Sequence, residues 1–409
     1  MKNIILSITF LISLHLTAQE LPVSNPLDLD TKIGRGLNFN FNEGNYFFKI
    51  GGMVQPYVGI QKDSTSNNKY FMNSRRNYLN FSGRAKNEKI AFLFQTDFSL
   101  SSPLLDAWVS YTPINNLKFT VGQVQTFANN KEMTIMENQL QFINRSLVSE
   151  QFSATGREFG LFVELKFNLG KIGIVPQAAV TSGDGRNSFG TTPTDYDLGG
   201  LKYAGRLNVF PFGFFSEGNN TQIADIKVEQ KPKIAFGASG SYNVGVSDST
   251  FGVGEGHGSF FLYDKLGKNK LPDYRKVSFD LHFKFKGFSL LTEYILATAK
   301  VTAGTYFDAT AVNALKATQI SQFLSLGNGY NVQTGYIYKK KYGIDFRYSS
   351  VTAEFSENIN SILKKRNEWT VGLTKYVDEN NLKYGASFSQ IDIGTSKTIV
   401  GAFTVQAAF

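Results

Sequence analysis

Apolar and polar side chains alternate with a period of two residues along most of this 409-residue chain. In 158–167, 276–285 and 342–348, Phe, Tyr, Leu, Ile and Val fall on one face, and polar or charged residues fall mainly on the other. Such alternation predicts β-strands with one face against apolar surroundings and one against water. A soluble β-sandwich alternates too. It does not need so many Phe and Tyr side chains, so the pattern favours strands that face lipid.

The alternation and the turn residues together predict sixteen strands. They are expected at 46–61, 71–85, 88–98, 104–112, 116–124, 157–168, 171–182, 199–210, 233–245, 273–285, 288–301, 328–339, 342–354, 366–377, 381–391 and 397–409. An even number of antiparallel strands closes into a barrel with both chain ends on one side of the membrane. We therefore predict an all-β fold, a transmembrane antiparallel β-barrel of about 16 strands.

Aromatic residues gather where these strands should meet the lipid headgroups. Trp369 with Tyr376 on one strand and Tyr336 with Tyr338 on another are examples. We expect them in the aromatic girdles at the two membrane interfaces. Random placement in a chain rich in Phe and Tyr is the alternative for any single residue.

The connections between these strands alternate in length. Short turns are expected at 86–87, 113–115, 169–170, 286–287, 340–341 and 378–380, and longer stretches at 62–70, 125–156, 183–198, 246–272, 302–327 and 355–365. Short periplasmic turns and longer external loops are typical of outer-membrane barrels. One connection, 210–232, breaks the rule. It should be a turn but is long, so we expect either a short strand pair or an insertion there.

The two ends of the chain predict export. Lys2, the apolar stretch 4–16 and the small residue Ala18 are typical of a signal peptide over 1–18, and the stretch is too short to span a membrane comfortably as a helix. Residues 19–45 then form a short periplasmic N-terminal arm, and 46–409 form the barrel. The last strand ends in Phe409, which resembles the signal recognised by bacterial barrel-assembly machinery. We therefore predict the cell outer membrane as the location.

Composition and charge extend this interpretation. Charged residues make up 18% of the chain, below the roughly 25% of a soluble domain, and there is no Cys. An exported chain without disulfides needs another source of stability, which a closed sheet supplies. The formal net charge is +9, and removal of Lys2 with the leader leaves 41 basic against 33 acidic residues, or +8. In a narrow channel such an excess raises the local concentration of anions.

Candidate anion-path residues follow from the alternation. It places these basic side chains inside the barrel: Arg76, Arg84, Lys118, Lys166, Arg206, Lys276, Lys284 and Arg347. The stretch 125–156 and its return add Lys131, Arg145 and Arg157. Inward acidic residues offset part of this charge, namely Asp97, Asp106, Glu164, Asp280, Glu293 and Asp345. A neutral lumen therefore stays open, as does a placement of the cations at strand ends, facing water or lipid phosphates.

The stretch 125–156 is too apolar for an exposed loop of its length. Its apolar residues include Met133, Ile135, Met136, Leu140, Phe142 and Ile143. We predict that it folds into the barrel and narrows the channel. The alternative is a loop that packs on a neighbouring subunit or on the barrel rim.

Several motifs resemble those of the phosphate-selective porin O/P family. The paired-arginine strand 75–84 is followed by motifs at 94–98, 106–109, 121–123, 142–147 and 156–160, in the family's order and spacing. The match covers about 49–180. This resemblance implies a sixteen-stranded homotrimeric barrel, a third loop folded inward and basic residues that guide anions such as phosphate.

From these observations we predict an outer-membrane porin for passive diffusion of small hydrophilic solutes, preferentially anions. The expected partners are membrane lipid and small solutes, and no cofactor, metal or nucleic acid is expected. Alternatives are a non-selective or substrate-specific channel, a surface adhesin or a barrel hydrolase. Catalysis is disfavoured because the chain has three His, one in the leader, His257 among glycines and His282 on a strand, with no accompanying nucleophile.

Overall fold

The computed structural model describes residues 34–42, 44–64, 68–85, 88–154, 156–187, 200–247, 260–300 and 303–409. The predicted signal peptide 1–18 lies outside the described residues, as does most of the predicted arm 19–45. The described part of that arm contains an unexpected strand, β1 (Leu37–Phe41), which pairs with the start of the first wall strand. The periplasmic assignment of the arm stays a prediction.

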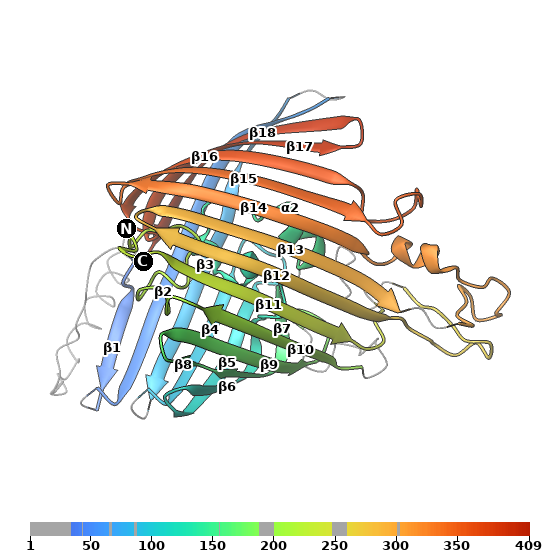
Figure 1. Ribbon diagram of the computed structural model, residues 1–409, viewed down its shortest axis with the longest axis horizontal. Coiled ribbons are helices and arrows are strands. Elements are labelled where there is room, and N and C mark those ends of the chain that lie inside the picture. The colour runs from blue at the N-terminus through green and yellow to red at the C-terminus, as the bar shows by residue number, and fades with distance from the viewer. Residues whose placement is uncertain are drawn as a thin grey trace, which may run out of the picture.

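A closed antiparallel barrel forms the body of the protein (Figure 1). Its wall strands are β2 (Tyr46–Asp63), β3 (Lys69–Ala85), β4 (Ile90–Asp97), β5 (Leu104–Ile114), β6 (Leu117–Gln125), β7 (Arg157–Leu165) with β8 (Phe167–Leu169), β9 (Ile172–Thr181), β10 (Lys202–Phe210), β11 (Lys233–Asn243), β12 (Asp273–Phe285), β13 (Phe288–Lys300), β14 (Gly327–Tyr338), β15 (Tyr342–Ala353), β16 (Arg366–Asp378), β17 (Leu382–Ile393) and β18 (Ser396–Ala408). Because β7 and β8 both pair with β9 and form one wall strand, the described wall has sixteen strands. The predicted fold class and strand number are confirmed.

The barrel closes where the last wall strand meets the first. β18 pairs with β2 from Thr398↔Asp63 to Ala408↔Met53. The main-chain N–H and C=O of Phe409 then bond Gly52 at 3.0 Å each. β1 continues along β2 beyond this point, from Leu37↔Ile50 to Phe41↔Tyr46. Closure pairs the edges that a membrane cannot tolerate.

Side chains alternate across the wall as predicted. On β12, Lys276, Ser278 and Lys284 are buried on the inner face, while Phe279 on the outer face is 55% exposed.

One prediction about the outer face is wrong. Tyr376 is expected beside Trp369 in an aromatic girdle, but it is 2% exposed and packs inside the barrel. Seven residues separate the two, so they fall on opposite faces of β16.

Connections at one end, the turn side, are short, as at 286–287, 339–341 and 379–381. Those at the other end, the loop side, are longer, with two exceptions at 98–103 and 394–395. The expected strict alternation of lengths is therefore wrong at these two places. No helix in the described part of the chain is long and apolar enough to cross a membrane.

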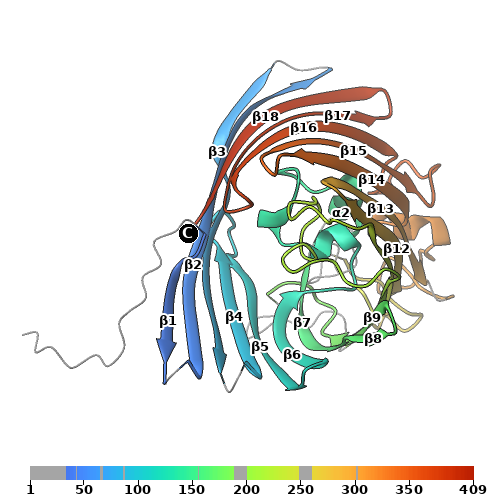
Figure 2. The same cartoon turned by 60° about the vertical axis from the view of Figure 1, so that its left-hand side comes forward.

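The long loop 126–156 enters the lumen, which confirms the predicted inward fold. It contains the short helices η1 (Lys131–Thr134), η2 (Glu137–Gln139) and α2 (Leu147–Phe152), and α2 lies inside the curve of the strands in Figure 2. The hydroxyl of Ser146 caps α2 by accepting from the amide of Ser149. Leu147, Val148 and Phe152 pack in an apolar cluster with side chains of β13, β15 and the loop-side connections.

The exceptional connection 211–232 is an insertion, and it contains no strand. It leaves β10 on the turn side and folds into the barrel, where Asn219, Ile223 and Asp225 are fully buried. Two chain segments from opposite rims therefore occupy the lumen.

Candidate functional site

The loop 126–156 is held in the lumen by cations of the wall that donate to its main-chain carbonyls. Arg76 Nη1 donates to Ile143 O (2.9 Å), Arg347 Nη1 to Asn144 O (2.9 Å), Lys276 Nζ to Phe152 O (2.9 Å) and Lys383 Nζ to Leu140 O (2.8 Å). Most of the loop lies outside its three short helices, so its buried carbonyls need donors from elsewhere. The lumen cations supply them.

Glu132 and Glu293 lie at the centre of the hydrogen bonds that attach the loop 126–156 to the barrel wall. Both carboxylates are buried. Glu132 accepts from the amide and hydroxyl of Ser146 (2.9 and 2.7 Å) and from the hydroxyl of Ser149. Glu293, on β13, accepts from the amide of Glu132 (2.7 Å) and the side chain of Asn130 (3.0 Å). These bonds join the start of the loop, the cap of α2 and the wall.

A second network surrounds Arg157 at the loop's return. Its Nε donates to Asp106 Oδ2 (2.8 Å) and its Nη1 to Glu137 Oε1 (3.1 Å), while Arg145 Nη2 also reaches Glu137 (3.1 Å). Burial alone would raise the pKa of Glu137, but Arg157 and Arg145 hold it well below its ordinary value. Glu137 is therefore an anion at neutral pH. It cancels positive charge of Arg145 and Arg157, which are both among the predicted anion-path residues.

Five of the predicted path residues are paired with carboxylates. These are Arg84 with Glu88, Arg145 with Glu137, Arg157 with Asp106 and Glu137, Arg206 with Asp280, and Arg347 with Glu368. Arg84 is half exposed at the end of β3, which agrees with the alternative that some of the cations lie at strand ends. The other four are nearly buried. A paired charge adds little field at a distance, because the two partners cancel.

Of the other six, Lys276 donates to Asn129 Oδ1 and Phe152 O, and five have no carboxylate partner among the ion pairs of the described residues. Arg76 and Lys284 donate to amide and carbonyl oxygens. Lys118 lies 5.3 Å from the ring centre of Trp108, and Lys166 lies 4.5 Å from that of Phe214. The fifth is Lys131. No ion pair with a carboxylate cancels the positive charge of these five cations.

Lys131 differs from the rest because its ammonium makes no hydrogen bond, ion pair or aromatic-ring contact within the described residues, although it is only partly exposed. It lies within electrostatic reach of Arg206, Asp280, Glu293 and Glu164. Burial and the neighbouring Arg206 lower the pKa of Lys131 to about 8. The charge on this residue therefore changes near physiological pH.

Sequence reasoning missed several lumen cations, among them Lys202, which pairs with Glu158, and the three that follow. Lys383 lies on the inner face of β17 and binds loop carbonyls, which the alternation of 381–391 could have revealed. Arg75 lies beside Arg76 at a bulge in β3, which interrupts the alternation. Arg186 follows β9 and lies within electrostatic reach of the lumen residues Arg157, Asp97 and Glu137, and its neighbour Asn187 bonds Gln123 through its amide and its side chain (2.6 and 3.1 Å). No sequence signal marks Arg186.

The two inserted segments cover the β11–β16 wall more fully than the opposite one. Inward residues such as Ser278, Asn331 and Thr370 are buried there. On the β17–β18 side, the inward residues Ser387 and Thr404 keep partial exposure. Water therefore reaches small polar side chains along this part of the wall.

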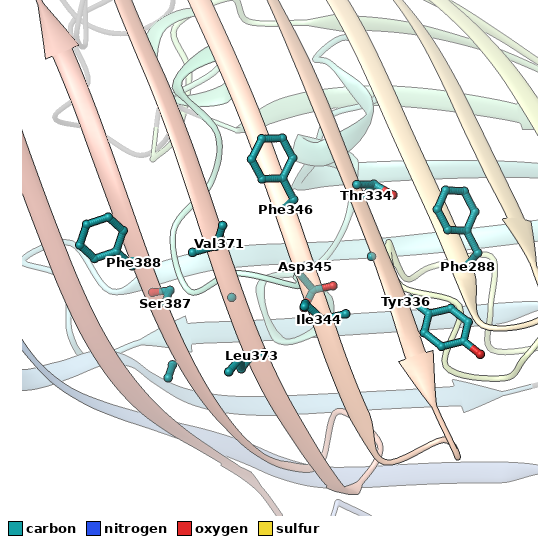
Figure 3. Close-up of a pocket in the computed structure, with 13 residues that line it drawn as sticks. Phe288, Thr334, Tyr336, Ile344, Asp345, Phe346, Val371, Leu373, Ser387 and Phe388 are labelled. Atoms are coloured by element: carbon teal, nitrogen blue, oxygen red, sulfur yellow. The ribbon is translucent and has the colours of Figure 1, made fainter.

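A groove of about 690 Å³ lies on the outer wall between β13 and β17 (Figure 3). Phe288, Tyr336, Ile344, Phe346 and Leu373 line it, and all belong to the outward set of the alternation. The groove is thus part of the apolar exterior and does not lead into the lumen.

The described residues offer few groups that could bind a metal ion or catalyse a reaction. In the parts of the chain that the structure describes, no group of three His, Cys, Asp or Glu side chains could hold a metal ion. His282 is buried, with Nε2 3.0 Å from Ile223 O and Nδ1 without a hydrogen-bond partner. Its ring contacts Phe215, so His282 contributes to the packing between the wall and the inserted segment.

The chain matches no protein-family model and no curated protein sequence. Solved structures are similar in fold. The outer membrane channel DcaP of Acinetobacter baumannii aligns with a TM-score of 0.53 at 12% identity, over 91% of this chain and 99% of that chain. An anion-selective porin from Comamonas acidovorans gives 0.53 at 10%, over 89% and 100%. The trimer form of OmpT, an outer membrane protein of Vibrio cholerae, gives 0.52 at 8%, over 89% and 99%. At such identities the likeness shows the fold, and the chain has the barrel architecture of outer-membrane porins.

Proposed function

We propose that this protein is an outer-membrane porin that passes small hydrophilic solutes by diffusion and prefers anions, phosphate among them. The observation that supports the preference is the set of lumen cations without a carboxylate partner, among them Lys131 near the start of the loop 126–156. A sixteen-stranded barrel is wide enough for an aqueous channel that inserted segments then narrow. Unpaired cations in such a channel attract anions.

The setting of the channel belongs to the same proposal. The turn side faces the periplasm, residues 1–18 direct export, and Phe409 engages the assembly machinery. The chain forms a homotrimer, in line with the named trimer form among the similar structures. Membrane lipid covers the apolar outer face.

A non-selective channel is the second candidate, because five of the eleven predicted path cations are cancelled by carboxylates. Reversal potentials across planar bilayers separate the two. In salt gradients of potassium chloride, potassium phosphate and a salt with a bulky anion, we expect discrete conductance steps. The reversal potentials should be shifted toward the equilibrium potential of the anion. Reversal potentials of zero favour the non-selective channel. The absence of conductance steps contradicts both candidate functions.

A further inference from the structure

The inserted segment 211–232 is bound to the wall by several hydrogen bonds. Lys284 Nζ donates to three of its carbonyls, those of Asn219 (2.6 Å), Gln222 (2.8 Å) and Ala224 (3.0 Å). The amide of Gly287 donates to Asp225 Oδ2 (2.8 Å). A segment with no strand pairing thus has a defined place in the lumen.

The same segment touches the tip of the loop 126–156 from the turn side. Ile223 is 1% exposed and packs with Ile135 and Leu140 of the loop and Leu291 of β13 in one apolar cluster. Without Ile223 the two loop side chains would lose the cover that closes this cluster toward the turn side.

A polar chain joins the two segments as well. Asn380 Nδ2 donates to Gln222 Oε1 (3.1 Å), and Asn380 Oδ1 accepts from Lys383 Nζ (2.8 Å). Lys383 also donates to the carbonyls of Asn138 (3.2 Å) and Leu140 (2.8 Å) at the loop tip. The segment, the turn after β16 and the loop tip therefore share one hydrogen-bond network.

We propose that segment 211–232 is a second constriction element, which holds the loop tip in place from the turn side and so sets the width of the passage. Ile223 and Lys284 are its positioning residues. This inference rests on the proposed channel function. Passage through the barrel is then bounded by two segments from opposite rims, and either one alone leaves a wider opening.

The first test uses variants with matched controls. Ile223→Ala removes the apolar cover, Ile223→Leu restores it, and Lys284→Met removes the donor to three carbonyls. Lys286→Met is the control, since Lys286 stands two residues away with its ammonium over the ring of Phe285. We expect conductance at least twofold higher, and a larger exclusion limit for neutral polymers, for Ile223→Ala and Lys284→Met. Wild-type values are expected for Ile223→Leu and Lys286→Met.

The second test needs no conductance. Because the chain has no Cys, Ile223→Cys combined with Leu140→Cys should form one disulfide in the folded barrel, detected by a gel shift that a reductant reverses. Ile223→Cys with Leu373→Cys, which lies on the outer wall, should form none. Failure to cross-link, or unchanged conductance in a folded Ile223→Ala barrel, overturns the proposal. Cross-linking in a barrel whose wild type does not conduct refutes the channel function, and with it the effect on passage, while the contact itself stands.

Discussion

Replacement of Arg157 by Gln tests whether the lumen cations hold the structure together or line an open path. The side chain is 5% exposed, with Nε 2.8 Å from Asp106 and Nη1 3.1 Å from Glu137. The shorter amide would keep some hydrogen bonding but leave two buried carboxylates without their shared cation. Removal of one partner from a buried ion pair costs about 3–5 kcal/mol. We expect a loss of that size in the free energy of unfolding.

The matched control is Lys166→Gln, which removes the same charge from an exposed position above Phe214. A cation–π contact at an exposed site contributes about 0.5–1 kcal/mol, so this variant should lose at most that much. Equilibrium urea unfolding in detergent micelles, followed by tryptophan fluorescence, measures both. If Arg157→Gln unfolds within about 1 kcal/mol of the wild type, the network does not hold the loop, and the division of the cations into supports and path residues fails.

Three further outcomes are expected. Because the pKa of Lys131 is lowered to about 8, its charge is present below that pH and lost above it. Anion preference should therefore fall as the pH rises through that value, and Lys131→Gln should remove this dependence of the reversal potential. Phe409→Ala removes a ring that is 55% exposed and fills the space above Gly52, so the free energy of unfolding, measured in urea, should fall by roughly 1.5–2.5 kcal/mol, about half of a fully buried case. Gly237→Ala would place a methyl group 2.2 Å from Arg206 Nη2, and urea unfolding should show a loss of about 1–3 kcal/mol.

The sequence predicts the wall well because the wall obeys a local rule. Each strand alternates between lipid and lumen, so a run such as Asp273–Phe285 can be delimited residue by residue. β1 was missed because it lies outside the closed ring and pairs with β2 alone over its whole length. The buried position of 211–232 depends on donors such as Lys284 on another strand, and no local pattern carries that information.

The sequence predicts which charged residues lie on the inner face of the barrel, but not which of them form ion pairs. Alternation places Arg206 and Asp280 correctly on the inner face. It does not reveal that two residues 74 positions apart bond each other at 2.6 and 2.8 Å. Whether a lumen charge is cancelled depends on the register of neighbouring strands and on the path of the loop. A list of inward cations therefore overstates the field that a passing anion meets.

The positive charge of this barrel serves two physical needs that composition cannot separate. The irregular parts of the loop 126–156 and the segment 211–232 bring main-chain carbonyls without strand partners into the lumen, and each buried carbonyl needs a donor. Long cationic side chains from the wall reach them, as Lys284 and Lys383 do. A neutral donor such as Asn could satisfy a single carbonyl, but an ammonium with three donors binds several at once. Part of the net charge is therefore the consequence of filling a wide barrel with irregular chain. Carboxylates cancel five of the predicted cations, so we expect a moderate anion preference, and the titration of Lys131 makes it depend on pH.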